Sequence, residues 1–349
     1  MWGADVCHPP RLVERLVLPP DAALSSINGN PAEAWSRAIS RPVLLFERVE
    51  RARQVAFDAL QVSGSVALSA NAPADVVETV KRLGGIPRFL ELDSGLGWRE
   101  SALAAGAAAW VTEQAGAGIR LPSSEHAPMI ADCAASLPLP GCELQSGIGI
   151  FELFLPGGAL LAFSDERLYK AACRLTNPGD APDPARALAQ CQRLYLSDGL
   201  VDRQQGVLAE LRRGLQEAAG LPLWPENRLS LAHGVGVHIP VETDAATFWA
   251  YAKAENTPLD WLPILQPVNY RALPARRSSA EHLSRWLLVP ANPDCGEREL
   301  RAAVLGVVKA AEYLGVRWRT NPQQAQSYAA LMDEMYGPGH DAYRLAFEV

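Results

Sequence analysis

SVALSANAPADVVETVKRLGGIPRFLELD, at residues 65–93, is the stretch that decides the fold. SVALSAN predicts a short buried strand, and APADVVETVKRLGG predicts an amphipathic helix that ends at Gly84 and Gly85. IPRFLELD then predicts a second strand. Two strands joined by a helix form a right-handed βαβ unit, in which the strands are parallel.

The same alternation continues on both sides of this unit. FERVERARQVAFDAL, at residues 46–60, places Val49, Ala52, Ala56 and Leu60 on one face, which predicts a helix. SALAAGAAAWVTEQ is expected to pass from helix into strand, and APMIADCAAS is expected to be another strand. Regular alternation of strands and helices predicts an α/β protein with a mainly parallel sheet.

A second informative stretch is FELFLPGGALLAF at residues 151–163. It predicts two apolar strands joined by a Pro-Gly-Gly turn, and it contains no lysine. Upstream, MIADCAAS places Asp132 at the end of an apolar run. A carboxylate at the carboxyl end of a buried strand is a common place for chemistry in open α/β sheets. Downstream, SDERLYKAACRL predicts a helix with Ser164 as its N-cap.

The chain is expected to divide into three parts. A large α/β domain covers residues 1–222, of which the first 40 are irregular apart from a short amphipathic piece at residues 31–39, and residues 185–219 form two long helical stretches. The turn-rich segment LPLWPENRL marks the boundary to a small α+β domain at residues 223–320. There, GVGVHIPVE predicts a strand, and DAATFWAYAKAEN, SSAEHLSRWLL and GERELRAAVLGVVKAAEYLG predict helices. Residues 321–349 are a predicted helical extension.

Composition narrows the class of protein. The 349 residues are 48% apolar and 20% charged, which is ordinary for a globular protein, and the net charge of −7 argues against a nucleic-acid or anionic-membrane partner. Six cysteines without a C-x-x-C pair predict free thiols in a reducing compartment. We find no secretion signal and no apolar run long enough to span a bilayer, so a cytoplasmic location is expected.

The order and wording of these segments resemble the sugar aminotransferases of the DegT/DnrJ/StrS family over residues 40–315. Residues 68–93 resemble the family's stretch from P-A-N-T to G-G-x-P-x-F-V-D, and MIADCAAS resembles its E-D-A-A-Q. The stretch from residue 147 to 179 resembles its F-S-F-x-P-x-K segment and the helix after it. The resemblance implies fold type I of the pyridoxal-phosphate enzymes, which is aspartate-aminotransferase-like, with a large mostly parallel sheet domain and a small α+β C-terminal domain.

The resemblance also implies a chemistry that this chain lacks the residues to perform. Transamination in the family needs a lysine that forms a Schiff base with the cofactor. The family places this lysine after F-S-F-x-P, but here the residues at 155–158 are LPGG. The whole chain has four lysines, and each belongs to a predicted helix whose exposed face explains it: Lys81, Lys170, Lys253 and Lys309.

Of about six cofactor contacts that the family implies, one is retained. Asp132 matches the aspartate that pairs with the pyridine nitrogen. Ala135 stands where the family has a glutamine that bonds the ring hydroxyl, and Pro73 stands where it has a stacking aromatic ring. Val49–Glu50 replace the phosphate-binding Gly-Thr, and Glu152 replaces the serine of F-S-F. The segment at residues 257–261 replaces the small-lobe G-V-H-Y-P. A carboxylate beside a phosphate would be repulsive.

We therefore expect a non-catalytic homologue with no catalytic residue and no bound pyridoxal phosphate. Asp132 would be a remnant cofactor contact, and Asn71, Glu152 and Ser136 would line a residual cleft. Two alternatives stay open: an active pyridoxal-phosphate aminotransferase for a keto sugar nucleotide with a rearranged site, and an enzyme with new chemistry that uses Asp132 and Glu152 as a carboxylate pair.

Partners follow from the same resemblance, since family members form dimers with active sites across the interface. We expect a homodimer, or a heterodimer with an active paralogue, and a possible small-molecule or sugar-nucleotide ligand, without nucleic acid or membrane. No metal site is expected: His233 and His238 are five residues apart on a predicted strand and face opposite sides.

Overall fold

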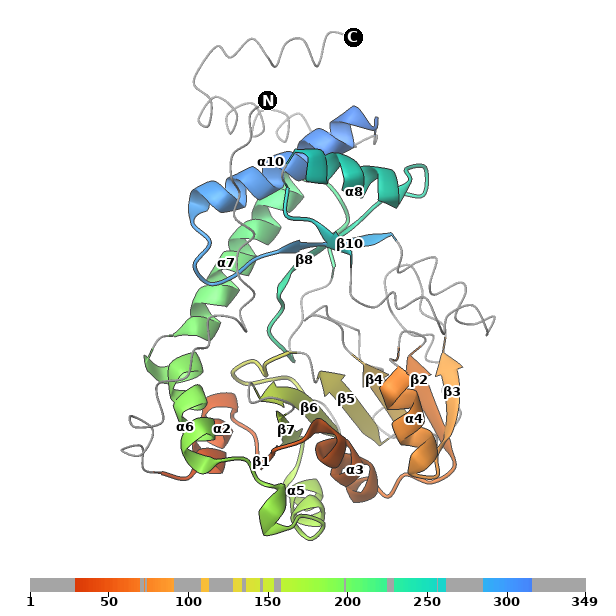
Figure 1. Cartoon of the computed structure of the whole chain (residues 1–349), viewed down its shortest axis with the longest axis vertical. Helices are drawn as coiled ribbons and strands as arrows, with labels where there is room; N and C mark the ends of the chain where they lie inside the picture. Colours follow the sequence, from red (N-terminus) through yellow and green to blue (C-terminus); the bar gives the residue numbers. More distant parts are fainter. Residues whose placement is uncertain are drawn as a thin grey trace.

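The computed structural model describes residues 29–69, 72, 74–90, 108–112, 128–133, 136–144, 147–153, 158–197, 199–224, 229–255, 257–261 and 285–315. Ten strands form two separate sheets within these residues (Figure 1). The larger sheet contains β1 (Val43–Phe46), β2 (Ser65–Ser69), β3 (Ile86–Leu90), β4 (Ala108–Thr112), β5 (Met129–Cys133), β6 (Ile148–Leu153) and β7 (Gly158–Phe163). Its strand order is β1-β7-β6-β5-β4-β2-β3.

The predicted βαβ unit is confirmed, and the sheet is mixed. β3, β2, β4, β5 and β6 run parallel to one another. β6 and β7 form the antiparallel hairpin expected from FELFLPGGALLAF, and β7 also pairs antiparallel with β1. Because two antiparallel pairings separate them, β1 and β6 point the same way. The carboxyl ends of β1 and β5 therefore lie at one edge of the sheet.

Helices cover both faces of the large sheet (Figure 1). One face is covered by α3 (Val49–Ala59), α4 (Ala74–Arg82) and α5 (Glu166–Cys173). The other is covered by α2 (Pro31–Ile39), α6 (Pro184–Cys191) and the start of α7 (Leu200–Gly214). Two π-helical stretches, at Gln192–Ser197 and Leu215–Ala219, and a 3₁₀ turn at Pro178–Asp180 complete this part. The fully buried strand β7 explains why its sequence has no polar residue.

The start of α5 corrects one expectation. Asp165, not Ser164, is the N-cap, because the Asp165 carboxylate accepts hydrogen bonds from the N–H groups of Arg167 and Leu168. The Ser164 hydroxyl instead accepts from the N–H of Gly147, 2.9 Å away, at the start of β6. Gly147 has φ +100°, and a Cβ there would overlap the carbonyl of Met129. Only glycine fits this close approach of β6 to β5.

The second sheet has the order β8-β10-β9, with β8 (Gly234–His238), β9 (Asp260–Trp261) and β10 (Trp286–Pro290). Helices α8 (Ala245–Ala254) and α10 (Glu297–Tyr313) pack on it and confirm two predicted helices. The prediction of a helix at SSAEHLSRWLL is wrong for its last residues, since Trp286–Pro290 form strand β10. All five residues of this strand pair antiparallel with β8. Pairing with a neighbouring strand overrides the local helical pattern. Residues 278–284 lie outside the described residues.

Helix α7 connects the two sheets (Figure 1). Leu200 and Val201 at its start belong to the core of the large sheet, whereas Leu211 near its end belongs to the core of the small sheet. Between them, the buried Gln204 donates hydrogen bonds to the carbonyls of Ala232 and Ala291, each 3.0 Å long. The expected domain boundary at residue 222 stays a prediction.

Candidate functional site

Asp132 stands at the carboxyl edge of the large sheet, as the penultimate residue of β5. Its residue is 1% exposed, so the carboxylate is removed from bulk water. Along β5 it shares a face with Ile130, which packs in the same core as α3 and α4. Because α3 follows β1, it begins at this edge too. The fold therefore brings the first turns of α3 beside Asp132, the residue that the resemblance assigns to a cofactor contact.

Arg53 of α3 pairs with the Asp132 carboxylate. Its Nε donates to Asp132 Oδ2 across 2.9 Å, and Trp110 Nε1 of β4 donates to the same oxygen across 3.2 Å. The side chains of Arg53 and Asp132 are 7% and 1% exposed. Burying a charge costs free energy unless it is paired and hydrogen-bonded, and here both conditions are met.

A second carboxylate completes the cluster. Arg53 Nη1 donates to Asp75 Oδ2 across 2.5 Å, from the opposite side of the guanidinium. Asp75 lies in the first turn of α4, and its side chain is 61% exposed. Burial opposes the charge of Arg53, but the charges of Asp132 and Asp75 outweigh it, so the pKa of Arg53 is raised. Arg53 thus links β5, α3 and α4 through one planar group.

Sequence reasoning missed Arg53 and Trp110. A signal for Arg53 was available, because it lies four residues after Val49 and three before Ala56, on the face assigned to the core. Within α3 it is flanked by the buried Ala52, Val55, Ala56 and Phe57. An arginine on a buried helix face requires a partner, but the local pattern does not say which carboxylate provides it.

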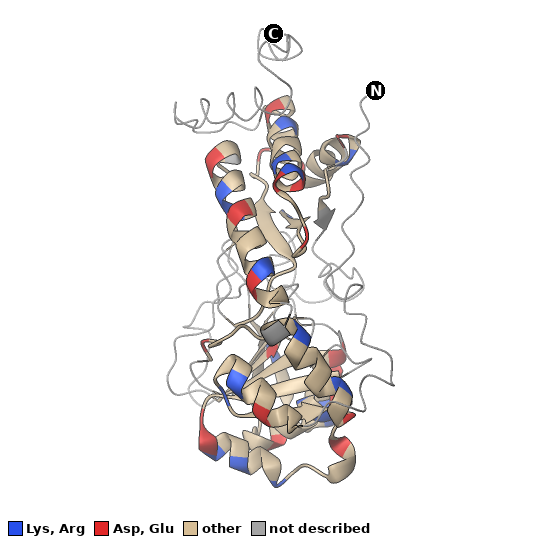
Figure 2. Cartoon of the chain, turned by 90° about the vertical axis from the view of Figure 1, so that its left-hand side faces the viewer, with Lys and Arg blue, Asp and Glu red and all other residues tan. Residues whose placement is uncertain are grey.

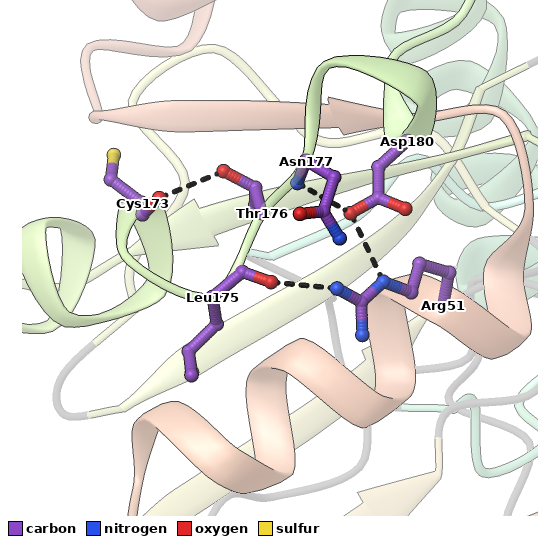
Figure 3. Close-up of polar contacts among 6 residues, drawn as sticks. All are labelled: Arg51, Cys173, Leu175, Thr176, Asn177 and Asp180. Carbon is purple, nitrogen blue, oxygen red and sulfur yellow. Dashed lines mark hydrogen bonds and ion pairs between the residues drawn. The ribbon is translucent and has the colours of Figure 1, made fainter.

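The first turn of α3 is where the family resemblance places the phosphate. Val49 and Glu50 occupy it, with no glycine, and Arg48 at the N-cap position makes no side-chain capping bond. Arg51 donates from Nε to Asp180 Oδ2 at 3.0 Å and from Nη2 to the carbonyl of Leu175 at 2.6 Å. Figure 3 shows this contact. The start of α3 carries charges of both signs: Glu50 in its first turn, and Arg48 and Arg51, whose charges act on Asp180.

Asp180 is built into the turn that follows α5 (Figure 3). Its carboxylate accepts a hydrogen bond from the N–H of Asn177 at 2.8 Å, and its carbonyl accepts from the N–H of Glu47 at 2.9 Å. Burial acts to raise the pKa of Asp180, but the hydrogen bonds from Asn177 and Arg51 and the charges of Arg51 and Arg48 outweigh it, and the pKa is lowered. The turn is therefore fastened to the start of α3 by both its backbone and its side chain.

The structure describes some of the other predicted site residues and not the rest. Ser136 is buried, and its N–H donates to the carbonyl of Cys133, the last residue of β5. Glu152 pairs with Ala159 in the hairpin backbone, but its side chain lies outside the described residues, so the carboxylate-pair hypothesis stays a prediction. Asn71, Pro73, Ala135 and residues 154–157 also lie outside them. Their assignment to a cleft or a cofactor contact stays a prediction.

The segment at residues 257–261 belongs to the small-sheet core at its start. Thr257 is 2% exposed, and its N–H donates to the carbonyl of Ala252 at the end of α8. A Cβ on Gly306 of α10 would overlap the Thr257 side chain, so this threonine packs directly on the α10 backbone. The Leu259 carbonyl accepts from Trp249 Nε1 at 3.0 Å. Thr257 and Leu259 are therefore part of the packing between α8, α10 and the small sheet.

All four lysines lie on described helices. Three contact a glutamate, and the fourth lies over a tryptophan ring. Lys81 is in the last turn of α4, which connects the parallel strands β2 and β3 and so ends at the amino edge of the sheet, opposite Asp132. The Nζ contacts are Lys81 to Glu78 at 2.8 Å, Lys170 to Glu166 at 3.7 Å, Lys309 to Glu255 at 3.1 Å, and Lys253 to the Trp249 ring centroid at 5.9 Å.

The described thiols are poor candidates for chemistry. Five described cysteines are free, and burial raises the pKa of Cys142 to about 11 and that of Cys191 to about 12, so neither is a ready nucleophile. Within the described ranges, no group of three or more His, Cys, Asp or Glu residues could hold a metal ion. In Figure 2 basic and acidic residues lie beside one another on the helices of both lobes. No helix in the described part of the chain is both long and apolar enough to cross a bilayer.

The two sheets, their helices and the position of Asp132 define the fold of the type I pyridoxal-phosphate aminotransferases. Solved structures of aminotransferases, among them a putative sugar aminotransferase from Streptococcus pneumoniae, share it. The aminotransferase TlmJ from Streptoalloteichus hindustanus superposes with a TM-score of 0.62 at 16% identity, covering 84% of this chain and 96% of that one. PseC from Helicobacter pylori, an aminotransferase involved in the biosynthesis of pseudoaminic acid, gives 0.65 at 11% identity, with coverages of 84% and 96%.

NtdA from Bacillus subtilis, solved with bound pyridoxamine phosphate, gives a TM-score of 0.65 at 14% identity and covers 85% of this chain and 83% of that one. No protein-family model and no curated protein sequence matches the chain. At these identities the likeness shows the fold, and the chemistry has to be argued from the residues.

Proposed function

We propose that this protein is a non-catalytic homologue of the sugar aminotransferases, which acts as a binding or partner subunit in sugar or secondary-metabolite biosynthesis. The observation that carries the proposal is the state of Asp132. Its carboxylate, which the resemblance assigns to a pyridine nitrogen, is paired within the chain with Arg53. A ring nitrogen at that oxygen would compete with a buried guanidinium.

The remaining residues do not fit pyridoxal phosphate. The first turn of α3 offers Glu50 where an anion would bind, and the four lysines are engaged on helices, with Lys81 at the opposite edge of the sheet. A Schiff base needs an amine that reaches the cofactor aldehyde. The residues at 154–157, where the resemblance places that amine, contain none in the sequence.

The test uses purified full-length protein and pyridoxal 5′-phosphate. After incubation, dialysis and borohydride reduction, we expect no absorbance band of a bound cofactor and no stoichiometric adduct on any lysine by peptide mass spectrometry. Surface lysines react weakly with the aldehyde, so a reference is required. Because the chain has four lysines, a variant with all four changed to arginine is a complete control. Equal absorbance of the two proteins supports the proposal.

A stoichiometric adduct on one lysine, lost in the lysine-free variant, would instead show that the chain binds the cofactor and would favour the alternative, an active aminotransferase with a rearranged site. The partner role is tested separately by co-expression with a catalytically competent aminotransferase from the same genome and by measuring the mass of the complex. We expect a homodimer or a heterodimer, since the fold buries family active sites at a subunit interface. A monomer at all concentrations, with no complex, would contradict the partner role.

A further inference from the structure

Arg53 donates a hydrogen bond to one oxygen of the buried Asp132 carboxylate, the group that a positively charged ligand would have to approach. We propose that Arg53 is the internal occupant of this site: a side-chain cation that takes the place of a cationic nitrogen ligand and excludes it. The inference rests on the proposed function, because it assigns the buried carboxylate a partner within the chain. It adds a specific residue, and a site that its removal would open to guanidinium-type and pyridinium-type cations.

One oxygen of the Asp132 carboxylate already accepts two hydrogen bonds. Asp132 Oδ2 accepts from Arg53 Nε at 2.9 Å and from Trp110 Nε1 at 3.2 Å. A carboxylate oxygen offers about two lone-pair directions. Both donors therefore use the directions through which a ring N–H would approach this oxygen.

Displacing the Arg53 guanidinium from Asp132 would cost free energy. A ligand at Asp132 Oδ2 would leave the guanidinium of Arg53 beside Asp75 alone, and Asp75 faces water with a 61% exposed side chain. Arg53 itself is 7% exposed on α3, between buried apolar residues. Removing one partner from a buried ion pair is strongly destabilising, because the remaining charge is left without compensation. A ligand would have to supply that free energy in addition to its own binding.

The two carboxylates are placed so that one planar guanidinium binds both of them. Nε faces Asp132 and Nη1 faces Asp75, so two edges of one planar group bind two carboxylates from different elements. A lysine ammonium is a single nitrogen on a flexible stem and does not reproduce this fork. One turn along α3, Phe57 packs against Trp110 with ring centroids 6.3 Å apart, which holds the helix against the sheet at this point.

The experiment is a chemical rescue with ethylguanidinium as the probe. We compare the thermal midpoints of the full-length wild-type protein, Arg53→Ala and the double variant Arg53→Ala with Asp132→Asn. The single variant is expected to melt about 5–10 °C below wild type, because the buried Asp132 carboxylate loses its arginine. Millimolar ethylguanidinium is expected to raise the midpoint of the single variant by about 2–4 °C more than that of wild type. The double variant is expected to show no such selective gain.

Arg51→Ala is the matched control, since it removes an arginine two residues away on the same helix that pairs with Asp180 instead. Its response to ethylguanidinium should equal that of wild type. If Arg53→Ala does not fold, Arg53→Met is compared with Arg53→Met combined with Asp132→Asn. The double variant is then expected to have the higher midpoint, because it contains no unpaired buried charge.

Two results would overturn the inference. One is equal rescue of the single and double variants, or no selective rescue of the single variant. The other is binding of pyridoxamine 5′-phosphate to wild-type protein with an affinity that falls in Asp132→Asn, since Arg53 would then not exclude the ring. Neither result depends on a lysine. A borohydride-fixed adduct would instead refute the proposed function, so the two failures are distinguishable.

Discussion

Arg51 and Arg53 lie two residues apart on α3, and each pairs with an aspartate from another element, but they differ in burial. The side chains of Arg53 and Asp132 are 7% and 1% exposed, whereas those of Arg51 and Asp180 are 20% and 17% exposed. The charges are the same, and the helix is the same. Because the electrostatic cost of an unpaired charge rises with burial, Arg53 defines the site, whereas Arg51 fastens a turn.

The largest expected effect is that of Asp132→Asn. It leaves Arg53 buried with a neutral partner and should lower the free energy of unfolding by about 3–5 kcal/mol, as measured by urea denaturation. The control is Asp75→Asn, at the exposed end of the same guanidinium, with an expected loss of about 0.2–1 kcal/mol. Equal losses in the two variants would contradict the difference drawn here between buried and exposed partners.

Trp110→Phe removes the second donor to Asp132 while it keeps an aromatic ring. Hydrogen bonds to charged groups contribute about 1.5–3 kcal/mol, and bonds between neutral groups about 0.5–1.5 kcal/mol. Trp35→Phe is the matched control, because Trp35 is also fully buried and its Nε1 donates to the neutral carbonyl of Ala187 at 3.0 Å. We expect Trp110→Phe to cost about 1 kcal/mol more in the free energy of unfolding. An equal cost would show that Asp132 does not depend on Trp110.

Arg51→Ala should have a smaller effect, about 1 kcal/mol, because a partly exposed ion pair contributes little to stability. Its salt dependence is the sharper measurement. Raising the ionic strength should shrink the difference between Arg51→Ala and wild type, since exposed charges are screened, but it should leave the effect of Asp132→Asn nearly unchanged. An equal effect of salt on the stability losses of Arg51→Ala and Asp132→Asn would contradict the difference in burial between the two ion pairs.

The smallest effect is expected in acid and concerns Asp180. Its pKa in the folded protein lies below the ordinary value of 3.8, so the carboxylate contributes stability above that value and loses it as the pH falls through the lowered pKa. Asp180→Asn should therefore lower the stability slightly at neutral pH and flatten its decline below about pH 4, because the variant lacks the charge whose contribution wild type loses in acid. Thermal midpoints measured across this range test it, and an unchanged acid slope would contradict the assigned direction.

Much of the fold could be predicted because it depends on local patterns. The βαβ unit at residues 65–90 and the hairpin of β6 and β7 follow from apolar runs and their glycine or proline turns. The prediction was wrong where a distant partner overrides the local pattern: Trp286–Pro290 is a strand because β8 pairs with it, and Asp165 rather than Ser164 caps α5 because Ser164 binds Gly147.

The sequence by itself determined the class of fold, the place of Asp132 at the end of β5 and the lack of a lysine in the hairpin segment, since each of these can be read from neighbouring residues. Only the tertiary structure decided what Asp132 binds. Its partner Arg53 is 79 residues away and reaches it because α3 leaves β1, the edge strand, and packs across β7 and β6 of the sheet. Strand order and helix packing are set by burial of the whole core, and no local pattern contains that information.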